Sequence, residues 1–396
     1  MKNITGETEF IIGIDFGSSE TCATVYDSKI GDKNDLEILP DLKVIKSAVA
    51  IFEEEGMDTI CVGDAAIQNA PYSKDFQIGF KKRPSEMNLF ERNRMVAFMH
   101  GVYREILHRY PDFAARSHVI YMSVPMSDYV FEKEEREYLK MAEDAGLPIA
   151  GIIKRYSAAI FHALSQPDSP IDQYYKNGFL LVDYGANTID FVYINGNLSK
   201  PIFGGNPIGA SAIERILLRY AMENPSDAYM TEFAKLYGSD EESLPYMLLL
   251  DRFRTAKERF YLDEHKRFSV LLDYQMLTAT GNIQIDGFGG VVIPKEKIDK
   301  ILGRNNRDSY IGQIKEYARF FKDNILIDNK VGCVYITGGA SRMDFVRPIF
   351  MEVFNLDEVH CLLDENPSVV ISQGIVDFVY EFYVARKYSQ EFNFFS

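Results

Sequence analysis

The chain has 396 residues, which suits two large lobes better than one small core. Its net charge of −15 argues against nucleic-acid and membrane partners, because both need a basic footprint. The four cysteines form no C-x-x-C pair, no apolar run is long enough to span a bilayer, and the N-terminus has no signal-peptide core. We therefore expect a soluble cytoplasmic protein with reduced thiols.

Strand-like and helix-like stretches alternate along the chain, which predicts an α/β fold. The first half predicts a hairpin at 10–27, a helix at 88–110, a strand at 118–125, a helix at 128–145, and a strand that runs into a helix at 151–164. The second half predicts a hairpin at 179–194, helices at 211–222, 245–262 and 309–324, strands within 266–293, a strand at 331–339 that leads directly into a helix, and a last helix at about 368–388.

An internal repeat is the most informative feature of the sequence. FIIGIDFGSSETCATVY and FLLVDYGANTIDFVYI share one plan, so that Asp15-Phe16-Gly17 corresponds to Asp183-Tyr184-Gly185. An Asp at the end of a buried strand projects into a cleft, and the Gly lets backbone N–H groups approach an anion. One copy alone would be an ordinary turn. Two facing copies would clamp a polyphosphate, with their acids holding Mg²⁺ through its water shell.

Two further observations refine this interpretation. Gly338-Gly339 lies at a predicted strand-to-helix junction, and a helix N-terminus after two glycines suits a phosphate or a ribose. No G-x-x-x-x-G-K-[ST] sequence occurs, which argues against a P-loop enzyme.

These segments resemble a known family. GIDFGSSE (13–20), LVDYGANTID (181–190) and ITGGASRMDFV (336–346) are similar to the two phosphate loops and the adenosine loop of the actin, sugar-kinase and heat-shock ATPase superfamily. Within it, the chain is most similar to the nucleotide-binding domain of the DnaK-type 70-kDa heat-shock chaperones. Further matching segments follow in the same order, at 62–70, 119–125, 152–160, 252–260 and 366–375.

The resemblance implies a two-lobed actin-like ATPase fold, with ribonuclease H-like duplicated domains, inserted subdomains and a nucleotide cleft between the lobes. Lobe I would span 1–176, with an insertion at about 40–115, and the C-terminal helix at about 368–396 would complete it. Lobe II would span 177–367, with an insertion at about 213–309.

The resemblance also implies roles for single residues, with ATP or ADP and Mg²⁺ as cofactors. Asp15, Asp183 and Asp190 would hold the metal through water, and Asp183 would also orient the attacking water. Thr188 would lie at the γ-phosphate, where a lysine is also expected. Lys81 is favoured over Lys82 for that contact, although a solvated surface is an equally good interpretation of the Lys-Lys-Arg run. The other expected nucleotide contacts are Gly17, Ser18, Ser19, Gly185, Ala186, Asn187, Gly209, Glu258, Gly338, Gly339, Ser341 and Arg342, with Glu258 at the ribose and Arg342 stacked on the base.

The chain departs from the family pattern at three places. Gly185-Ala186-Asn187 replaces a run of three glycines, and Arg155-Tyr156 replaces a Glu-Pro pair near the metal. The adenosine helix carries Tyr261 and Leu262 where the family has basic residues. The phosphate clamp is therefore better preserved than the adenine side. A cation at position 155 should disfavour Mg²⁺ and would be able to contact phosphate directly.

The leading hypothesis is a slow MgATPase that couples nucleotide state to lobe closure, without the substrate-binding domain of a full chaperone and with a protein partner or co-chaperone. One alternative is a nucleotide-binding interaction module with little or no turnover, which Arg155 and Asn187 motivate. A small-molecule kinase would need an additional catalytic Asp that the sequence does not reveal. An actin-like filament former is the last alternative, and the chaperone-like segments weigh against it.

Overall fold

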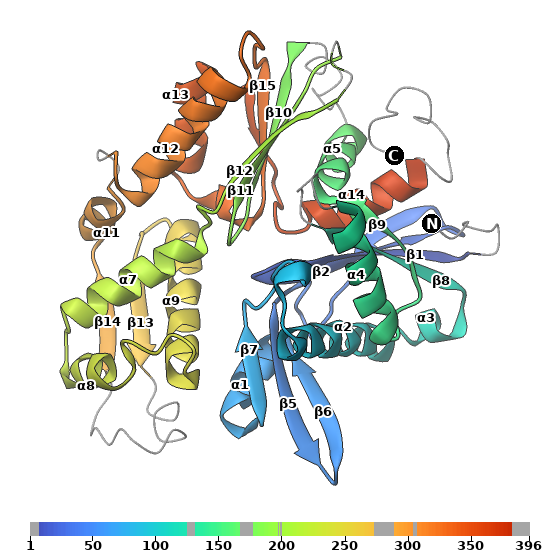
Figure 1. Ribbon diagram of the computed structural model, residues 1–396, viewed down its shortest axis with the longest axis horizontal. Coiled ribbons are helices and arrows are strands. Elements are labelled where there is room, and N and C mark those ends of the chain that lie inside the picture. The colour runs from blue at the N-terminus through green and yellow to red at the C-terminus, as the bar shows by residue number, and fades with distance from the viewer. Residues whose placement is uncertain are drawn as a thin grey trace.

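The structure is a computed structural model that describes residues 8–124, 131–166, 177–196, 198, 200–272, 289–303 and 307–381. Two mixed sheets of similar design each carry an inserted subdomain, and two helices lie between the sheets (Figure 1). We call residues 8–154 lobe I, residues 179–363 lobe II, and the two helices between them the connecting helices.

Lobe I is built on a sheet of order β3-β2-β1-β8-β9, with β4 paired to β2. Its central strand β1 is buried along its whole length, as expected for a strand whose two faces are both covered. Side chains from α2 and α4 pack on this sheet. The bounds are β1 Phe10–Phe16, β2 Glu20–Asp27, β3 Asp32–Asp35, β4 Val44–Lys46, β8 His118–Val124, β9 Ile149–Lys154, α2 Leu89–Arg109, α3 Pro111–Ala115 and α4 Phe131–Asp144.

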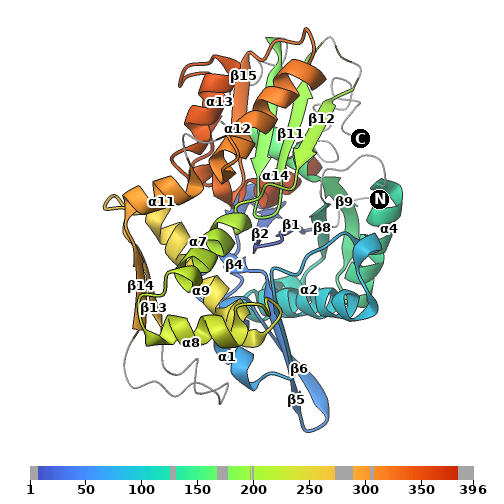
Figure 2. The same cartoon turned by 60° about the vertical axis from the view of Figure 1, so that its left-hand side comes forward.

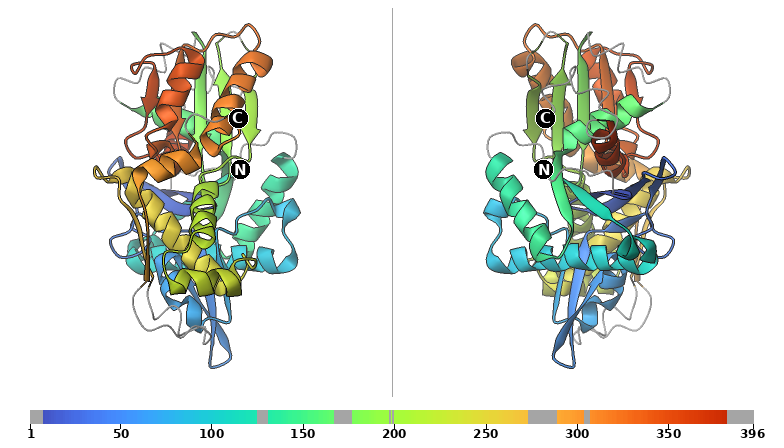
Figure 3. Two further views of the ribbon diagram at one scale, coloured as in Figure 1. Left: turned by 90° about the vertical axis from the view of Figure 1, so that its left-hand side faces the viewer. Right: turned by 90° about the vertical axis from the view of Figure 1, so that its right-hand side faces the viewer.

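The insertion in lobe I is a three-stranded sheet of order β6-β5-β7 with one helix. Its bounds are β5 Ala48–Glu54, β6 Met57–Val62, α1 Gly63–Asn69 and β7 Asp75–Ile78, with 3-10 turns at Ala70–Tyr72 and Pro84–Glu86. Figure 3 shows the β5–β6 hairpin at the opposite end of the molecule from the sheet of lobe II. A capping box of Asn88 and Glu91 then begins α2.

Lobe II repeats the design with a sheet of order β12-β11-β10-β15-β16. In both lobes the central strand pairs antiparallel with the next strand of its hairpin and parallel with a later strand. The internal repeat of the sequence therefore extends to the topology of the sheets. The bounds are β10 Phe179–Tyr184, β11 Ile189–Ile194, β12 Ile202–Asn206, β15 Cys333–Thr337, β16 Cys361–Leu363, α12 Tyr310–Phe320 with a π-helical turn Phe321–Ile325, and α13 Val346–Phe354.

The insertion in lobe II lies beside the insertion of lobe I (Figures 1 and 2). It consists of α7 Ser211–Glu223, α8 Ala228–Tyr237, α9 Leu244–Leu262, β13 Phe268–Leu272, β14 Gly289–Ile293 and α11 Lys295–Leu302. Met247 and Leu248 of α9 pack in one apolar cluster with Ala48, Ala50 and Phe76 of lobe I. The two insertions are therefore in contact with each other.

The connecting helices are α5 Arg155–Ser165 and α14 Val370–Val379. One apolar cluster joins both helices to strands of both sheets, through residues such as Ile11, Phe161, Leu181 and Phe378. The helices cross closely, because a Cβ on Gly374 would lie 1.9 Å from the carbonyl oxygen of Ala158. The lobes are thus joined by crossing segments.

The α/β class and the two-lobed arrangement agree with the prediction, but some elements differ. The expected helix directly after Gly338-Gly339 is wrong. Ser341 N donates to Gly338 O and Met343 N to Ala340 O, so a 3-10 turn forms at Gly339–Arg342 and α13 begins at Val346. Of the expected elements, Pro125, residues 128–130 and 273–288, and the chain after 381 lie outside the described residues. Within the described part, no helix is both long and apolar enough to cross a bilayer.

Candidate functional site

The twin hairpins place two carboxylates at matching positions in the two lobes. Asp15 pairs with Cys22 in the β1–β2 ladder, and Asp183 pairs with Asp190 in the β10–β11 ladder. Only 5% of Asp15 and 4% of Asp183 is exposed, so neither carboxylate has access to bulk water to stabilise its charge. Each buried carboxylate therefore needs a positively charged partner, and one residue pairs with both.

Arg155, the first residue of α5, bridges the two carboxylates. Its Nη1 lies 2.6 Å from Oδ1 of Asp15, and its Nε lies 3.0 Å from Oδ2 of Asp183. Burial lowers the pKa of Arg155, but the two carboxylates raise it more, so the net pKa is raised and the guanidinium stays charged. Ser123 donates a further hydrogen bond to Oδ1 of Asp15. Among the described residues, Oδ1 of Asp183 has no hydrogen-bond partner.

This arrangement does not fit the water-mediated Mg²⁺ shell expected from the sequence. A guanidinium lies between the two acids, and Thr188 donates to Oδ2 of Asp190 at 2.7 Å. Two unit charges 4 Å apart repel by about 4 kcal/mol in a protein site, and a divalent ion beside Arg155 would double that penalty. Burial also raises the pKa of Asp190 to about 6, which weakens it as an anionic ligand. Within the described part of the chain, no group of three or more His, Cys, Asp or Glu is placed to hold a metal ion.

The structure distinguishes between the two candidate lysines. Lys81 is only 9% exposed and donates to the carbonyl oxygen of Phe16, beside the first hairpin turn. Burial lowers the pKa of Lys81 to about 8. The Lys82 side chain is 54% exposed and forms an ion pair with Glu91. Lys81 is therefore buried beside the first hairpin turn, whereas Lys82 lies on the surface.

Hydrogen bonds to its carbonyl groups hold the first hairpin turn in place. Ser47 Oγ donates to Gly17 O at 2.7 Å, and Ser47 N donates to Ser19 O at 2.9 Å. A Cβ on Gly17 would lie 2.3 Å from Glu20 O, so this tight turn excludes a side chain. Protein donors therefore fix the carbonyl groups of Gly17 and Ser19 on either side of Ser18. A turn fixed in this way can offer its backbone N–H groups to an anion.

The second hairpin turn is fixed against the start of α7. Ala210 N donates to Gly185 O at 3.1 Å, and Ser211 N donates to Ala186 O at 2.8 Å. A Cβ on Gly209 would lie 2.0 Å from Ala186 O, which explains the glycine at that position. Asn187 and Thr188 are exposed at the tip of this turn. The turn is therefore rigid at its base and offers polar side chains at its tip.

The turn at Gly338-Gly339 lies directly against the second hairpin. Gly338 has φ +85°, and a Cβ there would lie 2.4 Å from Tyr184 O and 2.8 Å from Oδ1 of Asp183. The next residue is close to lobe I, because a Cβ on Gly339 would lie 3.3 Å from Oε2 of Glu20. Ser341 is buried, and its N–H donates to Gly338 O. The two glycines thus let the start of β2 and the ends of β10 and β15 come together.

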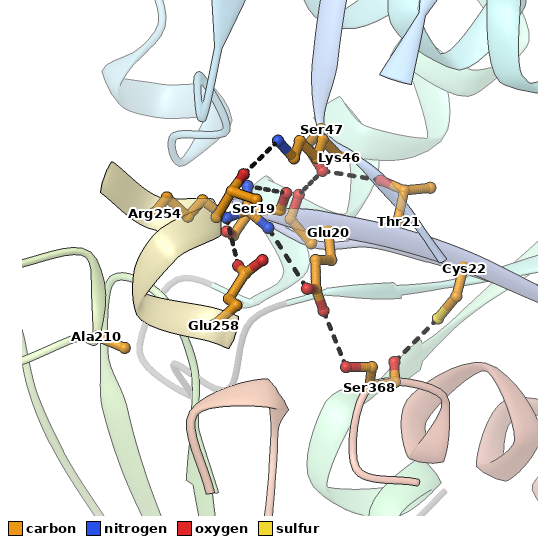
Figure 4. Close-up of polar contacts among 12 residues, drawn as sticks. Ser19, Glu20, Thr21, Cys22, Lys46, Ser47, Ala210, Arg254, Glu258 and Ser368 are labelled. Atoms are coloured by element: carbon orange, nitrogen blue, oxygen red, sulfur yellow. Dashed lines mark hydrogen bonds and ion pairs between the residues drawn. The ribbon is translucent and has the colours of Figure 1, made fainter. Parts of the chain in front are cut away.

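Glu258, expected at the ribose, belongs to a polar network that joins the lobes (Figure 4). Arg342, expected at the base, joins the same network through Ser368. Arg254 of α9 lies 2.7 Å from Oε1 of Glu258 and donates to Ser19 O at 2.9 Å. Burial raises the pKa of Glu258, but Arg254 lowers it more, and the net pKa is lowered. Arg342 Nη1 donates to Ser368 Oγ, which donates to Glu20 Oε2, both at 2.9 Å.

Several residues of this site were missed by the sequence reasoning: Glu20, Ser47, Ser123, Arg254 and Ser368. Arg254 carried a signal, since it lies one helical turn before Glu258 in the segment RFRTAKERF. The others gave none, because their contacts join segments that are distant in the sequence.

Comparison with known proteins gives one set of relatives. The chain is 21% identical to heat shock 70 kDa protein 13 of Pongo abelii over 424 aligned residues, which cover 93% of this chain and 88% of that protein. The proteins of the same name from Rattus norvegicus and Homo sapiens are also 21% identical, with the same coverage. No family model matches the chain. This weak but nearly full-length similarity supports a heat-shock 70-kDa-like relationship. It does not support the DnaK type specifically. The fold is the expected two-lobed actin-like ATPase fold.

Proposed function

We propose that this chain is a heat-shock 70-kDa-like protein that binds ATP or ADP between its two lobes. The observation that carries the proposal is the meeting of the twin hairpins within the reach of one side chain, since Arg155 contacts both Asp15 and Asp183. Buried Lys81 flanks the first hairpin, and Gly338 flanks the second. Rigid turns, buried cations and a glycine loop at one junction are the parts that a polyphosphate site requires.

Each part has a role in this proposal. Lys81 and Arg155 neutralise phosphate charge, and the turns at Ser18 and at Asn187 donate hydrogen bonds to phosphate oxygens from opposite lobes. Gly338-Gly339 gives the nucleotide a close approach to the backbone of lobe II. Glu258 and Arg342 lie on the adenosine side. Because the nucleotide contacts both lobes, its binding favours the closed arrangement.

We also propose lobe boundaries at 176/177 and 367/368, a cytoplasmic location and a protein partner that responds to lobe closure.

Isothermal titration calorimetry with ATP and with ADP tests the proposal. The wild type is expected to bind both nucleotides, and Lys81→Met should weaken binding by about tenfold or more, because a buried charge-assisted bond to phosphate is lost. Lys82→Met is the matched control and should bind as the wild type does, since Lys82 pairs with Glu91 on the surface. Absence of heat with either nucleotide would overturn the proposal.

A binding module without significant turnover is the second candidate, and Arg155 favours it. Asp183, the expected partner of the attacking water, accepts from Nε of Arg155 at 3.0 Å instead. Phosphate release from ATP by the wild type and by Asp183→Asn separates the two functions. Equal background rates identify a binding module, whereas a clear loss in Asp183→Asn identifies a slow ATPase.

A further inference from the structure

A protein side chain already occupies the position between the twin carboxylates where a divalent cation would be expected. Arg155 satisfies Asp15 at 2.6 Å and Asp183 at 3.0 Å, and only 17% of its side chain is exposed. Arg155 places a positive charge directly against Asp15 and Asp183, and buried Lys81 lies beside the first hairpin. Side chains therefore already offset part of the negative charge that a divalent cation would offset, and Asp190 is a third acid beside Asp183.

We propose that Arg155 replaces the divalent cation, so that this chain binds its nucleotide as the metal-free polyphosphate. The inference rests on the proposed nucleotide function and specifies the form of the ligand. In a metal-dependent site, the cation screens two acids from the phosphates and bridges phosphate oxygens. Arg155 performs the first task through its contacts with Asp15 and Asp183.

The guanidinium is also suited to the second task. It carries five N–H donors in one plane and pairs with phosphate oxygens through two parallel bonds. Its bonds to Asp15 and Asp183 use two of these donors, which leaves up to three for a phosphate. Lys81 lies beside the same hairpin and adds a second positive charge. A lysine at position 155 would supply the charge without the planar geometry.

The backbone position of Arg155 is fixed by its neighbour. Tyr156 is 2% exposed, and its ring packs edge-on against Phe203 of lobe II with centroids 5.2 Å apart. The start of α5 is thereby pinned between the lobes, and the guanidinium stays at the junction.

Calorimetric titration of the wild type with ATP and ADP, in excess EDTA and in excess Mg²⁺, tests the inference. The expected Kd differs by less than about threefold between the two conditions. Arg155→Glu should reverse this behaviour and bind at least about tenfold more weakly in EDTA than in Mg²⁺, because three acids then face the phosphates. Arg155→Gln replaces the positive side chain with a neutral one, and its nucleotide affinity in EDTA should fall by about tenfold.

Arg319→Glu in α12 is the charge-matched control, since the pairs that this exposed residue forms in the described part of the chain are with Glu316 and Glu352 of lobe II. It should behave as the wild type does in both conditions. Circular dichroism and thermal melting identify any variant that does not fold. The wild-type Kd in EDTA compared with that in Mg²⁺ tests the inference without relying on any variant.

The outcomes separate the two proposals. Wild-type affinity that rises tenfold or more with Mg²⁺ overturns the metal-free inference and leaves the nucleotide function standing. No binding in either condition overturns the nucleotide function and the inference with it. Equal affinity in EDTA and Mg²⁺, lost selectively in Arg155→Glu, supports both.

Discussion

The sequence predicts part of the role of Arg155 but not its contacts. Its replacement of an acid was visible from the resemblance, and an effect on Mg²⁺ was expected. Its bridging of both acids was not visible, because the partners lie 140 and 28 residues away along the chain. Whether a cation repels a metal, contacts phosphate or pairs with acids depends on the distance between the two sheets. Local sequence carries no information about that distance.

His162 predicts a pH dependence of stability. Its Nε2 lies 3.3 Å from Asp364, its Nδ1 lies 3.4 Å from Asp377, and those acids also accept bonds from Tyr335 and Lys33 respectively. Burial lowers the pKa of His162, but the two carboxylates raise it more, so the folded-state pKa is above the unfolded value of 6.5. Its stabilisation should therefore be complete below pH 6.5 and be lost as the pH rises through the folded pKa.

Urea unfolding at a series of pH values measures this effect. The free energy of unfolding of wild type minus that of His162→Gln should fall with rising pH, by about 1.4 kcal/mol for each unit by which the pKa is raised. The exposed His360, which pairs with Asp357, provides the control His360→Gln. A difference that stays constant or grows with pH would contradict the prediction.

Among the elements, the crossing of α5 and α14 is sensitive to side-chain volume. A Cβ on Gly374 would lie 1.9 Å from Ala158 O, so Gly374→Ala must push the connecting helices apart. We expect the free energy of unfolding to fall by about 1–3 kcal/mol, the usual penalty for overpacking. Gly290→Ala is the matched control, because its Cβ would have an ordinary contact at 3.5 Å. Equal melting temperatures for the two variants would refute the close crossing.

The second hairpin predicts an effect on nucleotide binding. Gly209→Ala would place a Cβ 2.0 Å from Ala186 O and displace the turn that carries Asn187. We expect nucleotide affinity to fall about tenfold, since misplaced donors lose their hydrogen bonds to phosphate, and we expect a loss of stability from the same overlap. Gly290→Ala, outside the proposed site and with its nearest contact at 3.5 Å, is the control. Calorimetry of both variants checks the prediction, and unchanged binding in Gly209→Ala would argue against the turn as a phosphate loop.

The elements that the sequence predicted well are those whose signal is local. Both hairpins, α2 and α9 have long apolar patterns that do not depend on distant partners. The 3-10 turn after Gly338 was missed, because glycine pairs suit a helix start and a tight turn equally. Short strands such as β4 and β16 were also missed, since three residues carry no recognisable alternation and their pairing depends on the rest of the sheet.

For the whole molecule, contacts among the described residues join the two lobes in addition to the connecting helices. Arg155 bridges the twin hairpins, and Lys46 of lobe I lies 2.6 Å from Asp251 of α9. Arg254 of α9 donates to Ser19 O of lobe I. An apolar cluster of the two insertions includes Met247 of α9 and Phe76 of lobe I. Its member Ala48 directly follows Ser47, which holds the first hairpin turn, so the apolar cluster borders the polar contacts.

Met247 is not among the residues proposed to contact the nucleotide, which makes it a position at which lobe closure can be altered. Met247 is 9% exposed, so Met247→Glu would bury an unpaired carboxylate unless the insertions separate. Separation loses the burial of the cluster, about 1.5–3 kcal/mol for each large apolar side chain, and the Lys46–Asp251 and Arg254–Ser19 contacts, whereas closure keeps the penalty for an unpaired buried charge. The variant should therefore populate the open arrangement more than the wild type does, and small-angle X-ray scattering should give a larger radius of gyration.

The matched control is Leu262→Glu on the same helix, because Leu262 is 67% exposed and its substitution should leave the radius of gyration unchanged. Saturating ATP or ADP should return Met247→Glu toward the wild-type value, since a ligand that contacts both lobes favours closure by its differential affinity for the closed state. Its Kd should be weaker than that of the wild type, because part of the binding free energy is used to close the lobes. An open variant that binds nucleotide as tightly as the wild type would show that binding and closure are independent, and would place the nucleotide contacts on a single lobe.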